Sequence, residues 1–153
     1  MDLILWRHAD AGESGEPAHD LDRPLTPKGE RQAQRVAQRL NHLLPSGTRV
    51  IASPAARTQQ TAQALERKFK TVAALGPEGT VDDLLSAVRW PDAREPVIVV
   101  GHQPTLGLAA ARLMAGVAQP WTLRKGAAWW LRCREREGAT QMVLVCALSP
   151  ETV

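Results

Sequence analysis

The sequence predicts an α/β fold in which a mostly parallel sheet is covered by helices on both faces. Short apolar runs, typical of fully buried strands, alternate along the chain with segments of helical periodicity. The strongest runs cover residues 3–6 and 97–100. Arg7 and His8 follow the first run directly, and His102 follows the second after one glycine. Because ligands in open α/β sheets bind outside the carboxyl ends of the strands, these side chains predict an anion site that contains a nucleophile.

The first predicted elements are a strand, a loop and a helix. The strand covers residues 2–6. Residues 9–26, rich in Gly, Pro, Asp and Glu, are interpreted as a long polar loop of the kind that is often functional. Thr26 suits the N-cap of a helix, and Pro27 suits its first position. Apolar residues then recur at spacings of three and four, which predicts an amphipathic helix that ends at Pro45.

A second strand and helix follow. Residues 49–52 form a short predicted strand, and Ser53-Pro54 repeats the combination of cap and proline, so we expect the next helix to start there. The remaining predicted elements are a strand over 71–75, a turn over 76–79, a short helix over 81–88, the strand 97–100, a helix over 105–114, and a closing strand pair over 127–134 and 141–148. The final pair, joined around Glu137-Gly138, is expected to add an antiparallel edge to the parallel sheet.

Composition and charge indicate an ordinary globular domain. The 153 residues are 44% hydrophobic and 23% charged, and we interpret residues 1–153 as a single domain. The formal net charge of +3 comes from scattered Lys and Arg residues, which fits an anionic substrate and gives no reason to expect a nucleic-acid partner. No apolar segment suits a membrane span or a signal peptide, and Cys133 and Cys146 show no Cys-x-x-Cys spacing. We therefore expect a cytoplasmic protein with no disulfide framework and no membrane partner.

A histidine nucleophile surrounded by arginines suits phosphoryl transfer. A neutral imidazole has a free lone pair at pH 7, so it needs little activation. Guanidinium groups then stabilise the charge on the phosphate oxygens, because they bind these oxygens bidentately and stay charged. His8, Arg7 and His102 supply such groups, and Arg57 lies in the first turn of the second predicted helix, where backbone N–H groups also favour an anion. No histidine pair or carboxylate cluster has metal-ligand spacing, so we expect no metal and no cofactor.

Four motifs, in order along the chain, resemble those of the histidine phosphatase superfamily. They are Leu5-Trp6-Arg7-His8-Ala9-Asp10-Ala11, Arg23-Pro24-Leu25-Thr26-Pro27-Lys28-Gly29, Ser53-Pro54-Ala55-Ala56-Arg57-Thr58-Gln59-Gln60-Thr61-Ala62, and Val100-Gly101-His102-Gln103-Pro104. The first resembles the Arg-His-Gly signature of that family, and the second resembles the start of its first helix. The last two resemble its second-arginine and second-histidine motifs. The short chain and the Arg-His-Ala-Asp-Ala variant are most similar to the SixA-type phosphohistidine phosphatases.

The resemblance implies a three-layer α/β/α sandwich of the phosphoglycerate mutase type and a metal-independent enzyme. It implies that His8 is the nucleophile and carries a transient phosphoryl group. It also implies that Arg7 and Arg57 clamp the phosphate oxygens, while His102 donates to the phosphoryl group from the opposite side. Arg23 either reaches the same pocket from the long loop and binds substrate, or holds that loop to a nearby aspartate.

Two features depart from the family pattern. Ala9 stands where the broader family has glycine. SixA-type relatives share this change, which is costly only if the backbone there requires a positive φ. In larger relatives, an acid between the second arginine and the second histidine protonates the leaving group. That stretch is short here: Glu78 lies nearest to the expected place for the proton donor, and Asp82, Asp83 and Asp10 are alternatives.

These residues predict a phosphatase that works through a covalent phosphohistidine intermediate. An alkoxide leaving group needs a well-placed acid, whereas an imidazole protonated on its second nitrogen leaves without much help. A pocket without a strong donor therefore favours phosphohistidine, and the resemblance implies a phosphohistidine on a protein, such as a phosphotransfer domain. The alternatives are a phosphatase of small phosphate monoesters, acting on a phosphorylated metabolite, and a non-catalytic phosphate-binding module on the same fold.

Overall fold

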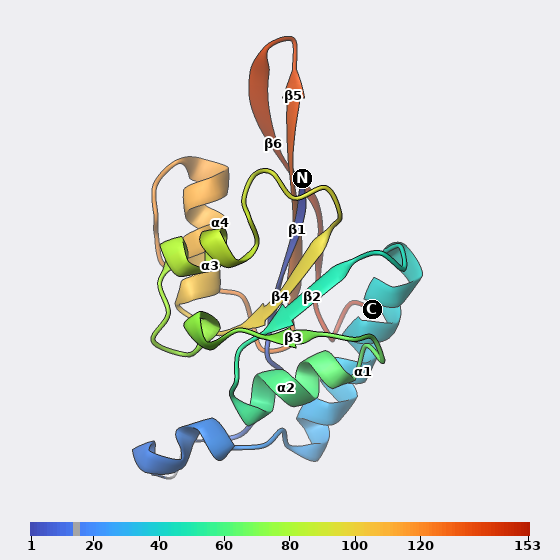
Figure 1. The fold of residues 1–153 in the computed structure, drawn as a ribbon. Helices are drawn as coiled ribbons and strands as arrows, with labels where there is room; N and C mark the ends of the chain where they lie inside the picture. The colour runs from blue at the N-terminus through green and yellow to red at the C-terminus, as the bar shows by residue number, and fades with distance from the viewer. Residues whose placement is uncertain (14–15) are drawn as a thin grey trace.

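The computed structural model of the chain describes residues 1–13 and 16–153 and contains a six-stranded mixed sheet (Figure 1). The strands are β1 (Asp2–Arg7), β2 (Arg49–Ala52), β3 (Lys70–Thr71), β4 (Val97–Gly101), β5 (Ala128–Arg136) and β6 (Ala139–Leu148). Their order across the sheet is β3-β2-β4-β1-β5-β6. The first four strands in this order are mutually parallel, while β5 pairs antiparallel with both β1 and β6. The prediction of a mostly parallel sheet with an antiparallel edge is confirmed.

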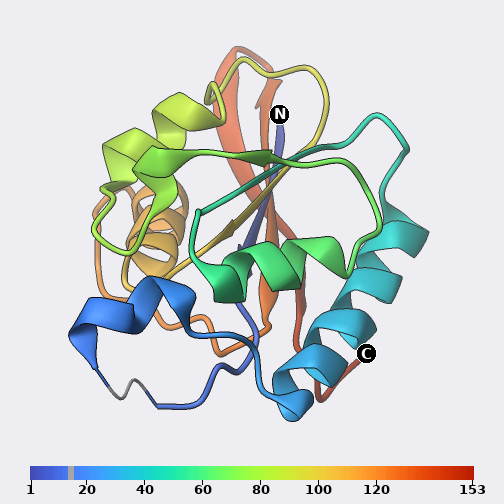
Figure 2. The same cartoon turned by 60° about the horizontal axis from the view of Figure 1, so that its bottom comes forward.

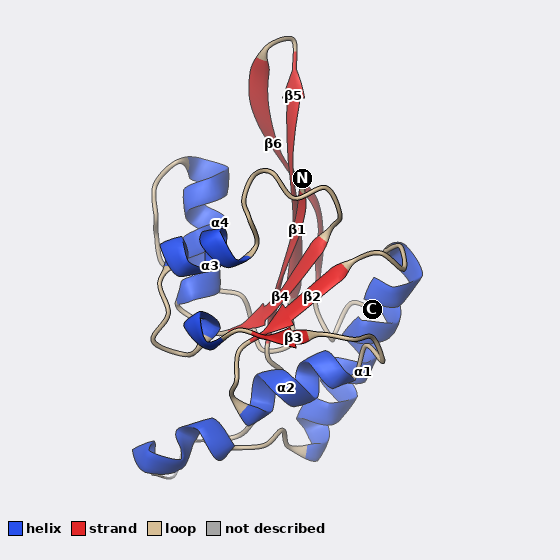
Figure 3. Cartoon of the chain, viewed as in Figure 1, coloured by secondary structure: helices blue, strands red, loops and turns tan. Residues whose placement is uncertain are grey.

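Helices cover both faces of the sheet (Figure 3). They are α1 (Pro27–Leu43), α2 (Ala56–Gln63), α3 (Val81–Ala87) and α4 (Thr105–Ala115), with two short 3-10 helices, η1 (Pro17–Asp22) and η2 (Ala73–Leu75). Apolar residues of α1 and α2 pack against one face, and those of α3 and α4 pack against the other. The three-layer α/β/α arrangement expected from the sequence is therefore confirmed.

Residues 3–6 of β1 are all apolar because both faces of this strand are buried. Leu3 and Leu5 belong to the core under α3 and α4, while Ile4 and Trp6 belong to the core under α1 and α2. All four side chains are completely buried, and each aliphatic one contributes roughly 1.5–3 kcal/mol to stability. A strand covered on both faces has no polar side to present, so it reads as a continuous hydrophobic run. This packing fixes the strand whose carboxyl end carries Arg7.

Helix α1 begins as the sequence predicts, and its start supports the segment that follows β1. Thr26 is the N-cap, its Oγ1 accepts a hydrogen bond from the Gly29 N–H at 3.0 Å, and Pro27 is the first helical residue. Gly29 also permits a close approach: a Cβ atom there would lie 2.0 Å from the backbone oxygen of Asp10. The absence of a side chain at this position therefore lets the helix pack directly against the chain just beyond His8.

The predicted start of α2 is wrong by two residues. The helix begins at Ala56, with Ala55 as its N-cap, and not at Ser53-Pro54. Ser53 still belongs to the sheet edge, because its N–H donates to the Val100 carbonyl at 3.1 Å. Its hydroxyl accepts the Ala55 N–H at 3.2 Å and is thus a local turn acceptor rather than a helix cap.

Two further expectations need correction. Residues 9–26 are not a structureless loop throughout, because η1 covers Pro17–Asp22; residues 14–15 lie outside the described part of the chain. The strand expected over 71–75 is only Lys70–Thr71, and Ala73–Leu75 form η2 instead. In both cases a short segment without clear periodicity takes a conformation that its neighbours determine.

The closing strand pair is present and longer than predicted. β5 and β6 turn at Glu137-Gly138, both of which have positive φ angles, 54° and 77°, as a two-residue type I′ hairpin turn requires. The far half of this hairpin extends beyond the rest of the sheet (Figure 1). Within the described ranges, none of the helices combines the length and the apolar character needed to cross a bilayer.

Candidate active site

The carboxyl ends of three neighbouring strands bring the polar residues of the sequence motifs together. His8 follows β1, Ser53 follows β2 and His102 follows β4, and these strands are adjacent in the sheet (Figure 2 turns this edge toward the viewer). The His8 N–H donates to the Gly101 carbonyl at 3.1 Å, which continues the β1–β4 pairing. As a result the His8 and His102 rings lie with their centroids 5.5 Å apart and their planes tilted by 56°.

The imidazole of His8 is buried, neutral and oriented. His8 is only 6% exposed, and its Nδ1–H donates to the Ala9 carbonyl at 2.7 Å. Because a carbonyl can only accept, Nδ1 carries the proton and Nε2 keeps its lone pair. Burial is the largest cause that lowers the pKa of His8, the positive charges of Arg57, Arg7 and Arg23 act in the same direction, and the resulting pKa is about 4. His8 therefore has the protonation state of a nucleophile at neutral pH.

The segment after His8 is held by side chains from both neighbouring helices. The Ala9 N–H donates to Thr61 Oγ1 of α2 at 3.1 Å, and the Asp10 N–H donates to Gln32 Oε1 of α1 at 2.9 Å. Ala9 is fully buried, and the described non-glycine residues with positive φ do not include it. Alanine at this position therefore carries no backbone strain, which removes the objection raised by the missing glycine.

Each of three arginines near His8 has one buried side-chain nitrogen that finds no hydrogen-bond acceptor among the described residues. Arg7 donates from Nη1 to the Leu123 carbonyl at 2.9 Å, and Arg57 donates from Nη1 to the Asp20 carbonyl at 2.8 Å. In the described part of the chain, the Nε atoms of Arg7, Arg23 and Arg57 are buried and have no hydrogen-bond partner. A buried donor without a partner is costly, so these guanidinium groups are suited to an anion that accepts from them.

Of the two roles that the sequence leaves open for Arg23, the structure shows the one in which it holds the loop to a nearby aspartate. Its Nη1 donates to the carbonyls of Ala11 and Gly12 at 3.2 and 2.9 Å, and its Nη2 pairs with Asp20 Oδ1 at 3.1 Å. Arg23 thus holds the long segment after β1 together. Its charge also lowers the pKa of His8, which places the guanidinium within electrostatic reach of that ring.

His102 is the second buried imidazole of the site. It is 4% exposed, and its Nε2 shares a hydrogen bond of 2.7 Å with Ser53 Oγ. Burial is the largest cause that lowers the pKa of His102, the positive charge of Arg57 acts in the same direction, and the resulting pKa is about 3. Ser53 orients this ring, a role that sequence reasoning missed. The signal was present, because Ser53 opens the motif that contains Arg57.

The carboxyl groups considered as proton donors lie in different surroundings. Glu78 is exposed and lines a groove of about 590 Å³ together with Asp20 and Pro54. Asp83 accepts the Thr80 N–H at 3.0 Å in a capping box at the start of α3. Asp10 accepts from Thr26 Oγ1 at 2.7 Å and pairs with a lysine, so its carboxylate is already engaged. Asp82 pairs with Arg112 at 2.7 Å, so Glu78 is the one of the four candidates whose side chain makes no hydrogen bond or ion pair within the described residues.

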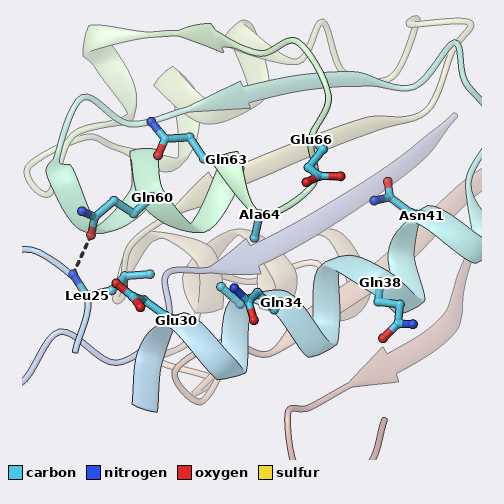
Figure 4. Close-up of a pocket in the computed structure, with 10 residues that line it drawn as sticks. Leu25, Glu30, Gln34, Gln38, Asn41, Gln60, Gln63, Ala64 and Glu66 are labelled. Carbon is cyan, nitrogen blue, oxygen red and sulfur yellow. Dashed lines mark hydrogen bonds between the residues drawn. The ribbon is translucent and has the colours of Figure 1, made fainter. Parts of the chain in front are cut away.

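A second groove of about 640 Å³ lies between α1 and α2 and contains none of the histidines or arginines of the site (Figure 4). Amide side chains dominate its lining, among them Gln34, Gln38 and Gln63. The Leu25 N–H donates to Gln60 Oε1 at 2.7 Å across one end of this groove. This contact ties the segment that precedes α1 to the helix that carries Arg57. In residues 1–13 and 16–153, no three His, Cys, Asp or Glu side chains are grouped so as to hold a metal ion.

We expect the stability of the protein to fall as the pH decreases from about 6.5 towards 4. In this window the unfolded chain protonates His8 near its ordinary pKa of 6.5, while the folded protein holds it neutral down to about 4. The unfolded state then binds more protons, so unfolding becomes easier at lower pH. Between pH 7 and pH 5 the expected loss is on the order of 2 kcal/mol for His8. Urea unfolding at both pH values measures it, and His8→Ala should show a smaller difference than the wild-type protein.

Comparisons with known proteins give a matching family model, a related sequence and similar solved structures. The family model described as "histidine phosphatase superfamily (branch 1)" matches residues 3–78. An uncharacterized protein of Picosynechococcus sp. is 37% identical over 125 residues, which are 76% of this chain and 74% of that protein. A solved structure of a candidate phosphohistidine phosphatase SixA from Nakamurella multipartitia has a TM-score of 0.77 and 30% identity, covering 97% of this chain and 95% of that one. A protein histidine phosphatase SixA complexed with tungstate has a TM-score of 0.75 and 25% identity, with coverages of 98% and 97%.

Proposed function

The chain belongs to the histidine phosphatase superfamily, and we propose that it is a phosphatase that transfers the phosphoryl group of its substrate to Nε2 of His8. The observation that carries this proposal is the neutral His8 imidazole, with Nε2 free, beside three arginines whose buried Nε atoms have no protein partner in the described residues. Such a site provides a nucleophile and the positive charge that a phosphoryl group requires.

The proposed reaction has two steps. Nε2 of His8 attacks phosphorus in line with the leaving group, so that a P–N bond forms as the bond to the leaving group breaks. Arg7 and Arg57 bind the equatorial oxygens, and His102, oriented by Ser53, stabilises the phosphoryl group from the other side. Water then attacks phosphorus, the P–N bond breaks, and inorganic phosphate leaves with His8 neutral again. The guanidinium groups supply the positive charge, so no step requires a metal ion.

We assign the substrate to phosphohistidine on a protein, such as a phosphotransfer domain. The phosphorylated imidazole leaves as a neutral group when its second nitrogen is protonated, so the reaction needs no strong acid. The groove beside Asp20 and Glu78 contains none of the four proposed catalytic side chains, but Asp20 joins it to Arg57. It is open to solvent, which suits a large substrate better than a small one. For substrates whose leaving group needs a proton, Glu78 is the proposed donor. The solved relatives described as phosphohistidine phosphatases support this assignment.

A substrate panel tests the assignment. We expect kcat/KM for a phosphohistidine peptide to exceed that for a phosphoserine peptide or a sugar phosphate by about tenfold or more, with activity retained in excess EDTA. Glu78→Gln should lower turnover of the esters while leaving turnover of phosphohistidine within about twofold. Equal or faster turnover of the esters would assign the chain to small monoesters instead. Binding of phosphate without turnover of any substrate would indicate a non-catalytic module.

A further inference from the structure

The arginine that is proposed to clamp the substrate is held in this structure by a carboxylate of the protein itself. Asp20, in η1, accepts from Arg57 twice: Oδ2 from Nη2 at 3.1 Å, and the backbone oxygen from Nη1 at 2.8 Å. Its other carboxylate oxygen accepts from Arg23 Nη2 at 3.1 Å. A single carboxylate therefore bridges two of the three arginines whose charges act on His8.

Asp20 lies where a negative charge affects the reaction centre directly. Its charge raises the pKa of His102, opposing the effects of burial and of Arg57. Burial raises the pKa of Asp20 itself, but the hydrogen bonds and charges of Arg23 and Arg57 outweigh this and hold the pKa below its ordinary value. The group is thus an anion at neutral pH, and it presents two oxygens to guanidinium groups as a phosphoryl group would.

The carboxylate satisfies these arginines only in part. The Nε atoms of Arg57 and Arg23 are buried and lack a partner among the described residues, even with Asp20 in place. A phosphoryl group offers three oxygens and up to two negative charges, so it can accept from more of these donors than a carboxylate can. The phosphoryl group is therefore favoured over the Asp20 carboxylate as the acceptor for Arg57 and Arg23.

The helix that carries Asp20 has little apolar packing to lose. Leu21 is 51% exposed, the side chain of His19 is 71% exposed, and Ala18 and Asp22 are exposed as well. Segments with few buried apolar contacts move at small cost in free energy. The contacts of Asp20 with Arg57 are thus prominent among the interactions that hold η1 to α2.

We propose that Asp20 is an exchangeable counter-ion of the phosphate site, which the phosphoryl group of the substrate displaces from Arg57 and Arg23 as η1 moves away. This inference rests on the proposed phosphate site and adds a specificity determinant to it. Because Asp20 competes for the same donors, weakly bound monoanions such as chloride or acetate are excluded. A phosphoryl dianion, with more charge and more oxygens, displaces the carboxylate. The displacement of η1 therefore depends on the charge of the ligand, and only a ligand with enough negative charge gains access to the two arginines.

The test compares Asp20→Asn with Asp22→Asn, which removes the same charge from the same 3-10 helix. Binding of inorganic phosphate and of tungstate is measured by calorimetry at fixed ionic strength, with thermal unfolding as a check of folding. We expect Asp20→Asn to bind phosphate about tenfold more tightly and to bind acetate detectably, while Asp22→Asn stays within about twofold of wild type. Weaker or unchanged phosphate binding in Asp20→Asn would overturn the counter-ion role but leave the phosphate site intact. No phosphate binding by any of the three proteins would overturn the phosphate site itself.

Hydrogen exchange of the wild-type protein gives a second, mutation-independent result. We expect added phosphate to increase exchange in residues 16–23 and to decrease it at the start of α2, near Arg57. Increased protection of residues 16–23 on phosphate binding would contradict displacement of η1, because it would mean that the segment closes over the ligand.

Discussion

His8→Ala is expected to lower kcat/KM for a phosphohistidine peptide by roughly 10³-fold or more, because the first step has no other nucleophile. The buried imidazole that could substitute for it, His102, is already hydrogen-bonded through Nε2 to Ser53. Since the arginines remain, binding of inorganic phosphate should persist in this variant. Steady-state kinetics and calorimetry together separate loss of chemistry from loss of binding.

The control for this prediction is His42→Ala, which changes an exposed histidine in the last turn of α1. We expect its kcat/KM to stay within about twofold of wild type, as for most surface substitutions. If His8→Ala kept activity within tenfold of wild type while remaining folded, a nucleophilic role for His8 would be untenable.

Arg57→Lys is expected to lower kcat/KM by roughly 10²-fold or more, although the charge is preserved. A lysine ammonium cannot reproduce the planar set of donors that Arg57 presents from the first turn of α2. The loss should fall on kcat more than on KM, because the charge to be stabilised grows in the transition state. Arg112→Lys on α4, where the arginine pairs with an exposed aspartate, is the matched control. Full activity of Arg57→Lys would show that only the charge at this position matters.

The central strands of the sheet were predictable because they are buried on both faces. In β1 and β4 every face is covered, so the hydrophobic runs have only one structural explanation, and the residues that follow them must lie at the sheet edge. The N-cap of α1 was equally predictable, because neither Thr26 nor Pro27 pairs with a neighbouring strand. Local sequence signals succeed where the local and the tertiary requirements agree.

Predictions from the sequence were wrong where tertiary contacts determine the conformation of the residues concerned. Ser53-Pro54 has the composition of a helix start, but Ser53 is bound to β4 through its N–H and to His102 through its hydroxyl, so α2 begins later. η1 has no periodicity that would predict it, and from the sequence Asp20 is only one of two aspartates, with Asp22, that lie near enough to pair with Arg23. The contact of Asp20 with Arg57, 37 residues away, depends on the fold.

The central claim is that His8 receives the phosphoryl group of the substrate in a site formed with Arg7, Arg57 and His102. The most direct measurement is rapid quenching of the enzyme during turnover of a phosphohistidine peptide, followed by mass spectrometric mapping of the phosphorylated residue under alkaline conditions. We expect a base-stable, acid-labile phosphoryl group on His8 that forms and decays fast enough to support turnover. Detection of the phosphoryl group on another residue would contradict the assignment of His8 as the nucleophile. So would turnover without any phosphorylated enzyme under conditions in which the second step is slow enough for the intermediate to accumulate.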